Sequence, residues 1–169
     1  MLKKRFIAVL IILEGKVVQS VKFKHTNVIH YDLVHAIEAF NKWSVDEIVV
    51  LNVSKNSESK YPFSKTLERI SKECFVPISA GGWITDHQYA KNLLRSGADK
   101  LILNTAFFQN PSFSKELADI YGKQCIVASM DVKKHETSQS RTVWVDRGRK
   151  DTGIPPKEWA KHVTKYGAG

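Results

Sequence analysis

The sequence predicts an α/β fold in which parallel strands alternate with helices. Short apolar runs such as Phe6–Leu13 and Ile48–Val53 have the length and composition of buried strands, and each is followed later in the chain by an amphipathic stretch. The connections are short, and glycine or proline marks many of the element ends. Repeated strand–helix units of this kind run their strands in parallel through right-handed crossovers.

Composition and charge fit one globular domain over residues 1–169, of which 43% are hydrophobic and 25% charged. Lys and Arg number 26 against 17 Asp and Glu, and this net charge of +9 favours anionic ligands such as phosphorylated metabolites. The basic residues are dispersed and no nucleic-acid recognition module accompanies them, so we expect no nucleic-acid partner. Cys74 and Cys125 are expected as buried thiols of a reducing compartment.

The first apolar run predicts a strand and not a signal or membrane segment. Lys3-Lys4-Arg5 precedes Phe6–Leu13, which is too short to cross a bilayer and lacks a small-residue cleavage site. We therefore expect a cytoplasmic protein with no membrane partner. Glu14-Gly15 then turns into Lys16–Phe23, whose apolar and polar residues alternate as in an exposed antiparallel ribbon, and Lys24–His30 is expected to be a loop.

The middle of the chain alternates helices and strands. Leu33, Ile37 and Phe40 share one face of a helix predicted over Asp32–Trp43. The elements expected after it are a strand at Ile48–Val53, a helix at Pro62–Cys74, a strand at Val76–Ala80 that ends in Gly81-Gly82, and a helix from Thr85-Asp86 to Gly97.

The remaining elements continue the pattern and then depart from it, which gives about five βα units in all. They are a strand at Lys100–Leu103, a helix at Pro111–Tyr121, a strand at Gln124–Asp131, a short extra strand at Arg141–Val145, a basic loop at Arg147–Gly153, and a helix from Pro155-Pro156 through Val163. Trp43, Trp144 and Trp159 have spacings consistent with core packing.

Short polar residues and glycines follow the predicted strands, where ligands bind in parallel α/β folds. Gly81-Gly82 and Asn104-Thr105 suit a phosphate, and Asp131 could move a proton. Two of these features have a simpler explanation. Asn104-Thr105 could be nothing more than a cap of the next helix, and Asp131 could be a structural acid that pairs with Lys133 or Lys134. The six histidines are scattered, so we predict no metal and no cofactor.

The strand–helix repeat fits either an open sheet or a barrel. No Gly-x-Gly-x-x-Gly follows the first strand, which argues against a dinucleotide-binding open sheet. A strand that enters at Gly97-Ala98-Asp99-Lys100 and ends in Asn104-Thr105 is typical of phosphate-binding barrels. A complete barrel needs at least about 200 residues. We therefore predict a (βα)8 TIM barrel of which about five βα units are present.

The chain resembles the cyclase subunit of imidazole glycerol phosphate synthase. That family is a (βα)8 barrel that takes ammonia from a glutamine amidotransferase (glutaminase) partner and acts in histidine biosynthesis on a phosphorylated small molecule. The resemblance runs along the whole sequence. Its main motifs are Leu2-Lys3-Lys4-Arg5-Phe6-Ile7, Glu14-Gly15-Lys16-Val17-Val18, Gly97-Ala98-Asp99-Lys100, Asn104-Thr105-Ala106, Asp131-Val132-Lys133, Thr152-Gly153 and Tyr166-Gly167-Ala168-Gly169.

The resemblance implies one catalytic residue and an altered pocket. Asp131 matches one of two catalytic aspartates, whereas the position of the other is Ile11, and losing a proton-transfer group costs about 10²–10⁴-fold in rate. Gln19 replaces a substrate-contacting lysine, Asn52 replaces a carboxylate, and Trp83 replaces the third glycine of the phosphate loop that contains Gly81 and Gly82.

The resemblance also implies a partner-facing end. Arg5, Glu47 and Lys100 match three of the four charges that gate the family's ammonia tunnel, and Asp99 matches an acid that contacts the glutaminase. The alternative is an ordinary ring of salt bridges, since charges at strand starts are common and exposed pairs contribute little.

Three functions are compatible with these residues. The preferred one is an ammonia-dependent synthase that amidates a surface sugar, because cyclase-like paralogues of surface-polysaccharide clusters share the aliphatic Leu10-Ile11-Ile12-Leu13 and Val21-Lys22-Phe23-Lys24. The first alternative is the histidine-pathway cyclase, a lyase. The second alternative is a non-catalytic barrel fragment or scaffold, which would self-associate through unpaired strand edges.

Overall fold

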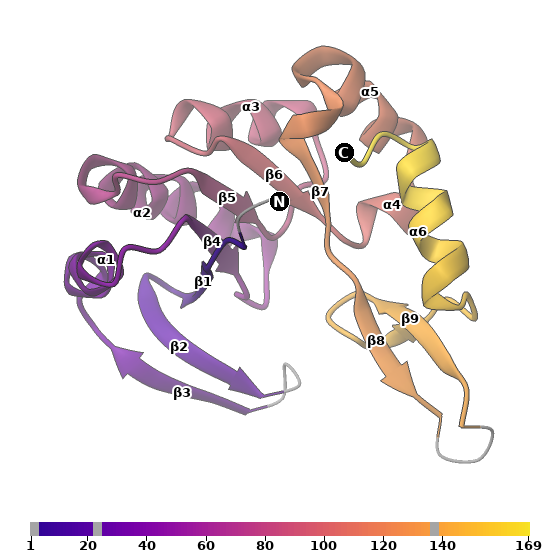
Figure 1. Cartoon of the computed structure of the whole chain (residues 1–169), viewed down its shortest axis with the longest axis horizontal. Coiled ribbons are helices and arrows are strands. Elements are labelled where there is room, and N and C mark those ends of the chain that lie inside the picture. Colours follow the sequence, from indigo (N-terminus) through magenta and orange to yellow (C-terminus); the bar gives the residue numbers. More distant parts are fainter. Residues whose placement is uncertain (1–3, 22–24, 136–138) are drawn as a thin grey trace. The chain divides into compact units, whose positions relative to one another are not determined.

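A computed structural model describes residues 4–21, 25–135 and 139–169. The chain forms two compact units, Met1–Leu101 and Ile102–Gly169. Figure 1 shows the elements of each unit in sequence colours. Each unit is described by itself below.

The first unit is built on three parallel strands, β1 (Ile7–Leu13), β4 (Glu47–Asn52) and β5 (Ile78–Gly81). β1 pairs with β4 from Ile7 opposite Glu47 to Ile12 opposite Asn52. β4 pairs with β5 from Ile48 opposite Ile78 to Leu51 opposite Gly81. Because the strands are parallel, their amino ends meet at one edge and their carboxyl ends at the other. The helices of this unit are α1 (Leu33–Lys42), η1 (Ser57–Ser59), α2 (Lys60–Glu73) and α3 (His87–Arg95).

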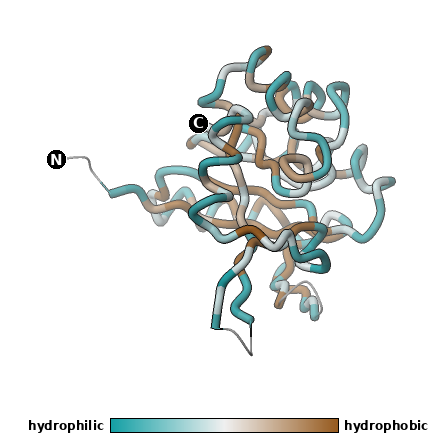
Figure 2. Tube along the Cα trace, turned by 90° about the vertical axis from the view of Figure 1, so that its right-hand side faces the viewer, coloured by the Kyte–Doolittle hydropathy of each residue, from teal (hydrophilic) through white to brown (hydrophobic). Residues whose placement is uncertain are grey.

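The core of the first unit lies on one face of β1. Its residues alternate, so that Leu10 and Ile12 are buried while Ile7 and Val9 are 44% and 55% exposed. The helices contribute apolar residues to the same core, namely Leu33, Ile37, Phe63, Leu67, Ile70, Tyr89, Ala90 and Leu93. Figure 2 shows the hydropathy along the trace, in which hydrophobic and hydrophilic stretches alternate.

The predicted antiparallel ribbon is confirmed, and it is longer than expected. β2 (Lys16–Val21) pairs with β1 through Val17 opposite Ile12, and it also pairs with β3 (His25–His30). The expectation of a loop at Lys24–His30 was therefore wrong for the described residues. The error arose because β3 is largely exposed and carries no apolar alternation, so only its backbone pairing marks it as a strand.

The second unit combines helices with a small antiparallel sheet. The boundary between the units falls within β6 (Lys100–Leu103), whose last two residues belong to the second unit. The amide of Ser129, which follows β7 (Ile126–Ala128), donates to the carbonyl of Leu103. Trp159, Phe107, Leu117 and Ile126 are fully buried. The other elements are α4 (Ala106–Gln109), α5 (Pro111–Tyr121), η2 (Lys123–Cys125), β8 (Asp131–Lys134), β9 (Arg141–Val145), β10 (Lys150–Asp151) and α6 (Pro156–Lys165).

The strand expected over Gln124–Asp131 is the second correction. A 3₁₀ turn occupies Lys123–Cys125, β7 has three residues, and Asp131 opens the next strand, where it pairs with Trp144. The apolar run predicted a single strand because nothing in its sequence shows that its last residue, Asp131, pairs with Trp144 of β9. The basic loop at Arg147–Gly153 likewise contains the two-residue strand β10.

Predictions about single side chains were right in part. Trp159 is fully buried, as expected, but Trp43, which directly follows the last residue of α1, is 66% exposed. Cys74 and Cys125 are half-buried free thiols and not buried ones. The α/β architecture with parallel strands is confirmed, whereas closure into a barrel stays a prediction. Within the described ranges, no helix is both long and apolar enough to cross a membrane.

Candidate functional site

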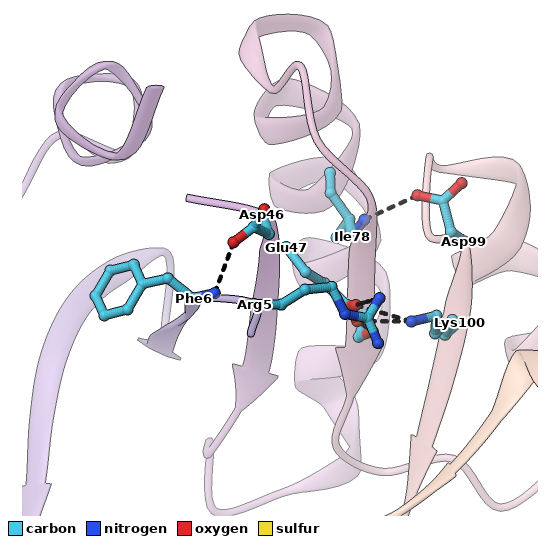
Figure 3. A network of polar contacts seen from close by, with 8 residues as sticks. Arg5, Phe6, Asp46, Glu47, Ile78, Asp99 and Lys100 are labelled. Carbon is cyan, nitrogen blue, oxygen red and sulfur yellow. Dashed lines mark hydrogen bonds and ion pairs between the residues drawn. The ribbon is translucent and has the colours of Figure 1, made fainter. Parts of the chain in front are cut away.

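The predicted gate charges meet at the amino ends of the parallel strands (Figure 3). Lys100 Nζ lies 2.9 and 2.8 Å from the two carboxylate oxygens of Glu47, and Ser79 Oγ donates to Oε1 at 2.6 Å. Arg5 Nη1 is 3.7 Å from Oε2, and the Arg5 side chain is 63% exposed. Glu47 itself is 4% exposed. The structure thus brings Arg5, Glu47 and Lys100 together around one buried carboxylate.

Glu47 is held in its charged form. Burial alone raises the pKa of Glu47, but hydrogen bonds from Lys100 and Ser79 and the charges of Lys100 and Arg5 outweigh burial. The pKa of Glu47 is therefore below its ordinary value of 4.5. The Glu47 carboxylate is therefore ionised at neutral pH, where it pairs with Lys100.

Asp99 and Asp46 fasten the starts of neighbouring strands. Asp99 Oδ2 accepts from the Ile78 amide at 2.8 Å, and Asp46 Oδ2 accepts from the Phe6 amide at 2.7 Å. In each pair the aspartate amide also donates 2.8 Å to the carbonyl of the same residue. Asp99 is exposed, so these bonds leave it at the surface. The role of Asp46 was missed, although it stands directly before Glu47 in the sequence.

Three exposed aromatic residues flank the same strand starts. Phe6 precedes β1 and is 62% exposed, Trp43 precedes β4 and is 66% exposed, and Phe75 precedes β5 and is 85% exposed. Large exposed apolar groups mark an interaction surface where they form one contiguous patch. For Trp43 and Phe75 the available signal was an aromatic residue between a helix end and a strand start.

The carboxyl ends of β1 and β4 carry amide and hydroxyl groups and no carboxylate at the predicted positions. Ile11 is half-buried and lies opposite Leu51. Asn52 Oδ1 accepts from the Ser54 amide at 3.0 Å, and its Nδ2 donates to Ser59 Oγ at 3.0 Å. The structure therefore places an amide side chain at the end of β4 and an apolar side chain at Ile11.

The turn after β5 is tightly packed. Gly82 has a φ of 108°, and a Cβ there would lie 2.3 Å from the Asn52 carbonyl oxygen, so this position needs glycine. Trp83 follows with a φ of 60°, and its Nε1 donates to the Ser54 carbonyl at 2.8 Å. Gly81 ends β5 opposite Leu51 and is buried.

In the second unit, Asn104, Thr105 and Asp131 lie close together. Asn104 Nδ2 donates to Asp131 Oδ2 at 3.2 Å, while Asn104 Oδ1 is buried without a protein partner among the described residues. Thr105 stands at the start of α4, but its hydroxyl accepts from the Asp146 amide at 3.0 Å and makes no bond to a helix amide. The helix-cap explanation therefore does not account for this side chain.

Asp131 is a half-buried carboxyl at the start of β8. Burial raises the pKa of its carboxyl above the ordinary value of 3.8, against the lowering effects of the Asn104 hydrogen bond and the Lys133 charge. Lys133 Nζ itself lies 3.9 Å from the centre of the Trp144 ring and donates to the Gly148 carbonyl. A carboxyl whose pKa is shifted toward neutrality donates and accepts protons more readily near pH 7.

No three His, Cys, Asp or Glu side chains gather as metal ligands in the part of the chain that the structure describes.

The sequence of this chain matches one protein family and several known proteins. The family described as histidine biosynthesis protein matches residues 5–169. Relatives include the putative imidazole glycerol phosphate synthase subunit HisF of Leptospira interrogans, at 34% identity, and imidazole glycerol phosphate synthase subunit HisF of Clostridium botulinum (strain Okra / Type B1) and of Bacillus cereus (strain G9842), at 36% and 38%. Each alignment covers 100% of this chain and 66% of the relative, so the chain spans just under two-thirds of their length.

Proposed function

The chain belongs to the family of histidine biosynthesis proteins, and we propose that it is a cyclase-type subunit of imidazole glycerol phosphate synthase, which uses ammonia in a ring-forming reaction. The relatives with 34% to 38% identity carry the name of that synthase. They support the histidine-pathway cyclase, expected above as an alternative, better than the amidation of a surface sugar.

The observation that carries the proposal is the Asp131 carboxyl beside Asn104. Its pKa is raised by burial, and Asn104 donates to one oxygen at 3.2 Å, which orients the carboxyl. In the proposed reaction the ammonia nitrogen adds to a carbonyl carbon of the substrate, and Asp131 moves protons from that nitrogen to the former carbonyl oxygen, which leaves as water and gives a C=N bond before the ring closes. Asp131 thus starts and ends the cycle in the same protonation state.

Ile11 sets the expected rate of this reaction. A half-buried isoleucine opposite Leu51 cannot exchange a proton, so the reaction depends on Asp131 alone. The test is turnover of the phosphorylated ribulosyl precursor with excess ammonium, which requires no partner. We expect Ile11→Asp to raise the rate by about 10²–10⁴-fold and Asp131→Asn to abolish it in both backgrounds.

A matched control for this test is Val9→Asp. Val9 lies two positions before Ile11 on the same face of β1 and is 55% exposed, so it adds the same charge to the same strand away from the carboxyl end. An equal gain from Val9→Asp, or no gain from Ile11→Asp in a folded protein, would contradict the proposed role of position 11.

The proposed substrate is phosphorylated, and its phosphate is assigned to Asn104 and Thr105, with Gly81 and Gly82 as a further substrate contact. Support comes from the buried Asn104 oxygen and from the position of both residues directly after β6. Titration with inorganic phosphate, followed by NMR of backbone amides, should shift the amides of Asn104 and Thr105. Unchanged amides at millimolar phosphate would count against this assignment.

The proposed ammonia source is a glutamine amidotransferase that docks at the amino ends of the strands. Support comes from the ion pair of Glu47 and Lys100 and from the exposed aromatic residues, of which Phe75 is 85% exposed. Calorimetry with a glutaminase subunit should detect a complex that Phe75→Ser weakens at least about tenfold. Ile120→Ser, a change at a 61% exposed residue of α5, is the matched control and should leave binding unchanged. Equal binding by both variants would exclude Phe75 from the interface.

Amidation of a surface sugar is the second candidate, because Ile11 and Trp83 depart from the family pattern at the carboxyl ends of β1 and β5. Both candidates share the ammonia source and the fold and differ in the acceptor. Ammonium incorporation into the ribulosyl precursor, but not into a sugar acceptor, would decide for the cyclase.

A further inference from the structure

β8 and β9 share a face on which Asp131 has a lysine and a tryptophan as neighbours. Alternate residues of a strand point to the same face, so Asp131 and Lys133 lie on one face of β8. The register places Asp131 directly opposite Trp144 of β9. A lysine two positions away on the same strand face has the length to reach an aspartate, so the sequence alone favours an ion pair. All three residues belong to the second unit.

The structure places the Lys133 ammonium elsewhere. Its Nζ lies 3.9 Å from the centre of the Trp144 ring, which is a cation–π contact, and it donates to the Gly148 carbonyl. In the part of the chain that the structure describes, no salt bridge joins Lys133 to Asp131, and the Asp131 carboxyl instead accepts from Asn104 at 3.2 Å. The simpler explanation of Asp131 as a structural partner of Lys133 therefore does not hold.

The Trp144 ring is itself fixed in place. Its Nε1 donates to Thr142 Oγ1 at 3.2 Å, and Thr142 is buried. His135 and Asp151 are charged or titratable groups of the same small sheet, and their side chains approach to 3.3 Å. The Lys133 charge lowers the pKa of Asp151 as well as that of Asp131. The ring therefore offers the ammonium a defined position that competes with pairing to either carboxylate.

We propose that Trp144 is a positioning residue of the proposed reaction, whose ring, together with the Gly148 carbonyl, holds the Lys133 ammonium off Asp131. The carboxyl is then left without a permanent counter-ion and is free to take up and release protons. A close ion pair with Lys133 would instead favour the charged carboxylate and oppose its protonation. This inference rests on the proposed function for the role of Asp131, and Trp144 acts on that residue through Lys133.

The experiment measures the pKa of Asp131 by carboxyl-carbon NMR in the 169-residue chain. Trp144→Leu removes the aromatic face, so Lys133 should turn to Asp131 and lower its pKa by about one unit. Trp144→Phe keeps an aromatic face for the ammonium and should restore a pKa close to that of the wild type. An unchanged pKa in folded Trp144→Leu would overturn the inference.

The double variant of Trp144→Leu with Lys133→Met separates the lysine from hydration. Loss of the ring also exposes the Asp131 carboxyl, and burial is what raises its pKa. Relative to Lys133→Met alone, the double variant should show less than about half of the fall that Trp144→Leu causes when Lys133 is present. A fall of the same size in both backgrounds would assign the effect to hydration and overturn the inference.

Lys133→Met alone gives a test that leaves the packed ring in place, since Lys133 is exposed. With the ammonium held off, its removal should raise the pKa of Asp131 by less than about half a unit, whereas a rise of about one unit or more would mean that the two form an ion pair. The matched control is Lys134→Met, which removes the same charge from the opposite face of β8 and should leave the pKa unchanged.

The pH dependence of ammonium-dependent turnover is the second readout. Its acid limb should move to lower pH in Trp144→Leu and return in Trp144→Phe, because it follows the Asp131 carboxyl. A purely structural role of Trp144 would lower the rate without moving the limb. Shifts of the pKa without a matching shift of the limb would reject the proton-transfer role of Asp131 in the proposed function, while the placement of Lys133 by Trp144 would stand.

Discussion

Replacing Lys100 by methionine is expected to destabilise the protein by about 2 kcal/mol, because it leaves a buried carboxylate without its main partner. Glu47 is 4% exposed and would lose two charge-assisted hydrogen bonds, of 2.9 and 2.8 Å. Removing one member of a fully buried ion pair costs about 3–5 kcal/mol. The expected value is lower because the Lys100 side chain is 27% exposed and Ser79 still donates to Glu47.

The assay is reversible urea or thermal unfolding at pH 7, where about 2 kcal/mol corresponds to a fall in melting temperature of roughly 4–8 °C for a chain of this size. The double variant Glu47→Leu with Lys100→Met should regain most of the loss, since an apolar pair of similar volume has no charge to desolvate. Arg5→Met is the control and should cost less than about 1 kcal/mol, because Arg5 is exposed and 3.7 Å from the carboxylate. A loss below about 0.5 kcal/mol for Lys100→Met would refute the argument, because it would mean that Glu47 is effectively hydrated.

Three further predictions concern protonation and the glycine turn. The pKa of Glu47 is lower in the folded state than its unfolded value near 4.5, so its contribution to stability is complete above pH 4.5 and is lost as the pH falls through the folded pKa. The free energy of unfolding of Glu47→Gln should therefore depend less steeply on pH in this acid range than that of the wild type. Asn104→Ala should raise the pKa of Asp131 further, because the Asn104 hydrogen bond lowers it, and a carboxyl-carbon NMR titration measures this directly. Gly82→Ala should cost at least about 2 kcal/mol in urea unfolding, because the new Cβ would meet a backbone oxygen at 2.3 Å, whereas Gly15→Ala has a positive φ but nothing within 4 Å and should cost about half as much.

The sequence predicted the parallel strands and their helices because periodicity and caps are local signals. Asp86 was expected near the start of a helix and does cap α3, and Pro111 begins α5 after the capping residue Asn110. β3 was missed because its residues are mostly exposed and its pairing with β2 is a non-local property. Asp131 was assigned to the wrong strand for the same reason, since only its pairing with Trp144 separates β8 from β7.

The candidate site was predictable as a set of residue types at strand ends but not as a set of contacts. Glu47 and Lys100 were expected to be near each other, but the third member of their cluster, Ser79, depends on the register that places it opposite Val49 in the neighbouring strand. The pairing of Asn104 with Asp131 likewise joins positions 27 residues apart. Single-sequence patterns give the face or the end of an element, whereas a contact also requires the alignment of two elements.

The charged residues at the amino ends of the strands also stabilise the fold, so a test of partner binding should not replace them. Asp99 accepts the Ile78 amide at 2.8 Å, and Glu47 is buried with Lys100. A variant of either acid that fails to bind a glutaminase could therefore fail because the strand starts have shifted. Phe75 is 85% exposed, and its replacement removes surface without breaking these polar contacts. A loss of binding in Phe75→Ser with unchanged unfolding is consequently stronger evidence for a partner face than the same loss in any variant of the charged cluster.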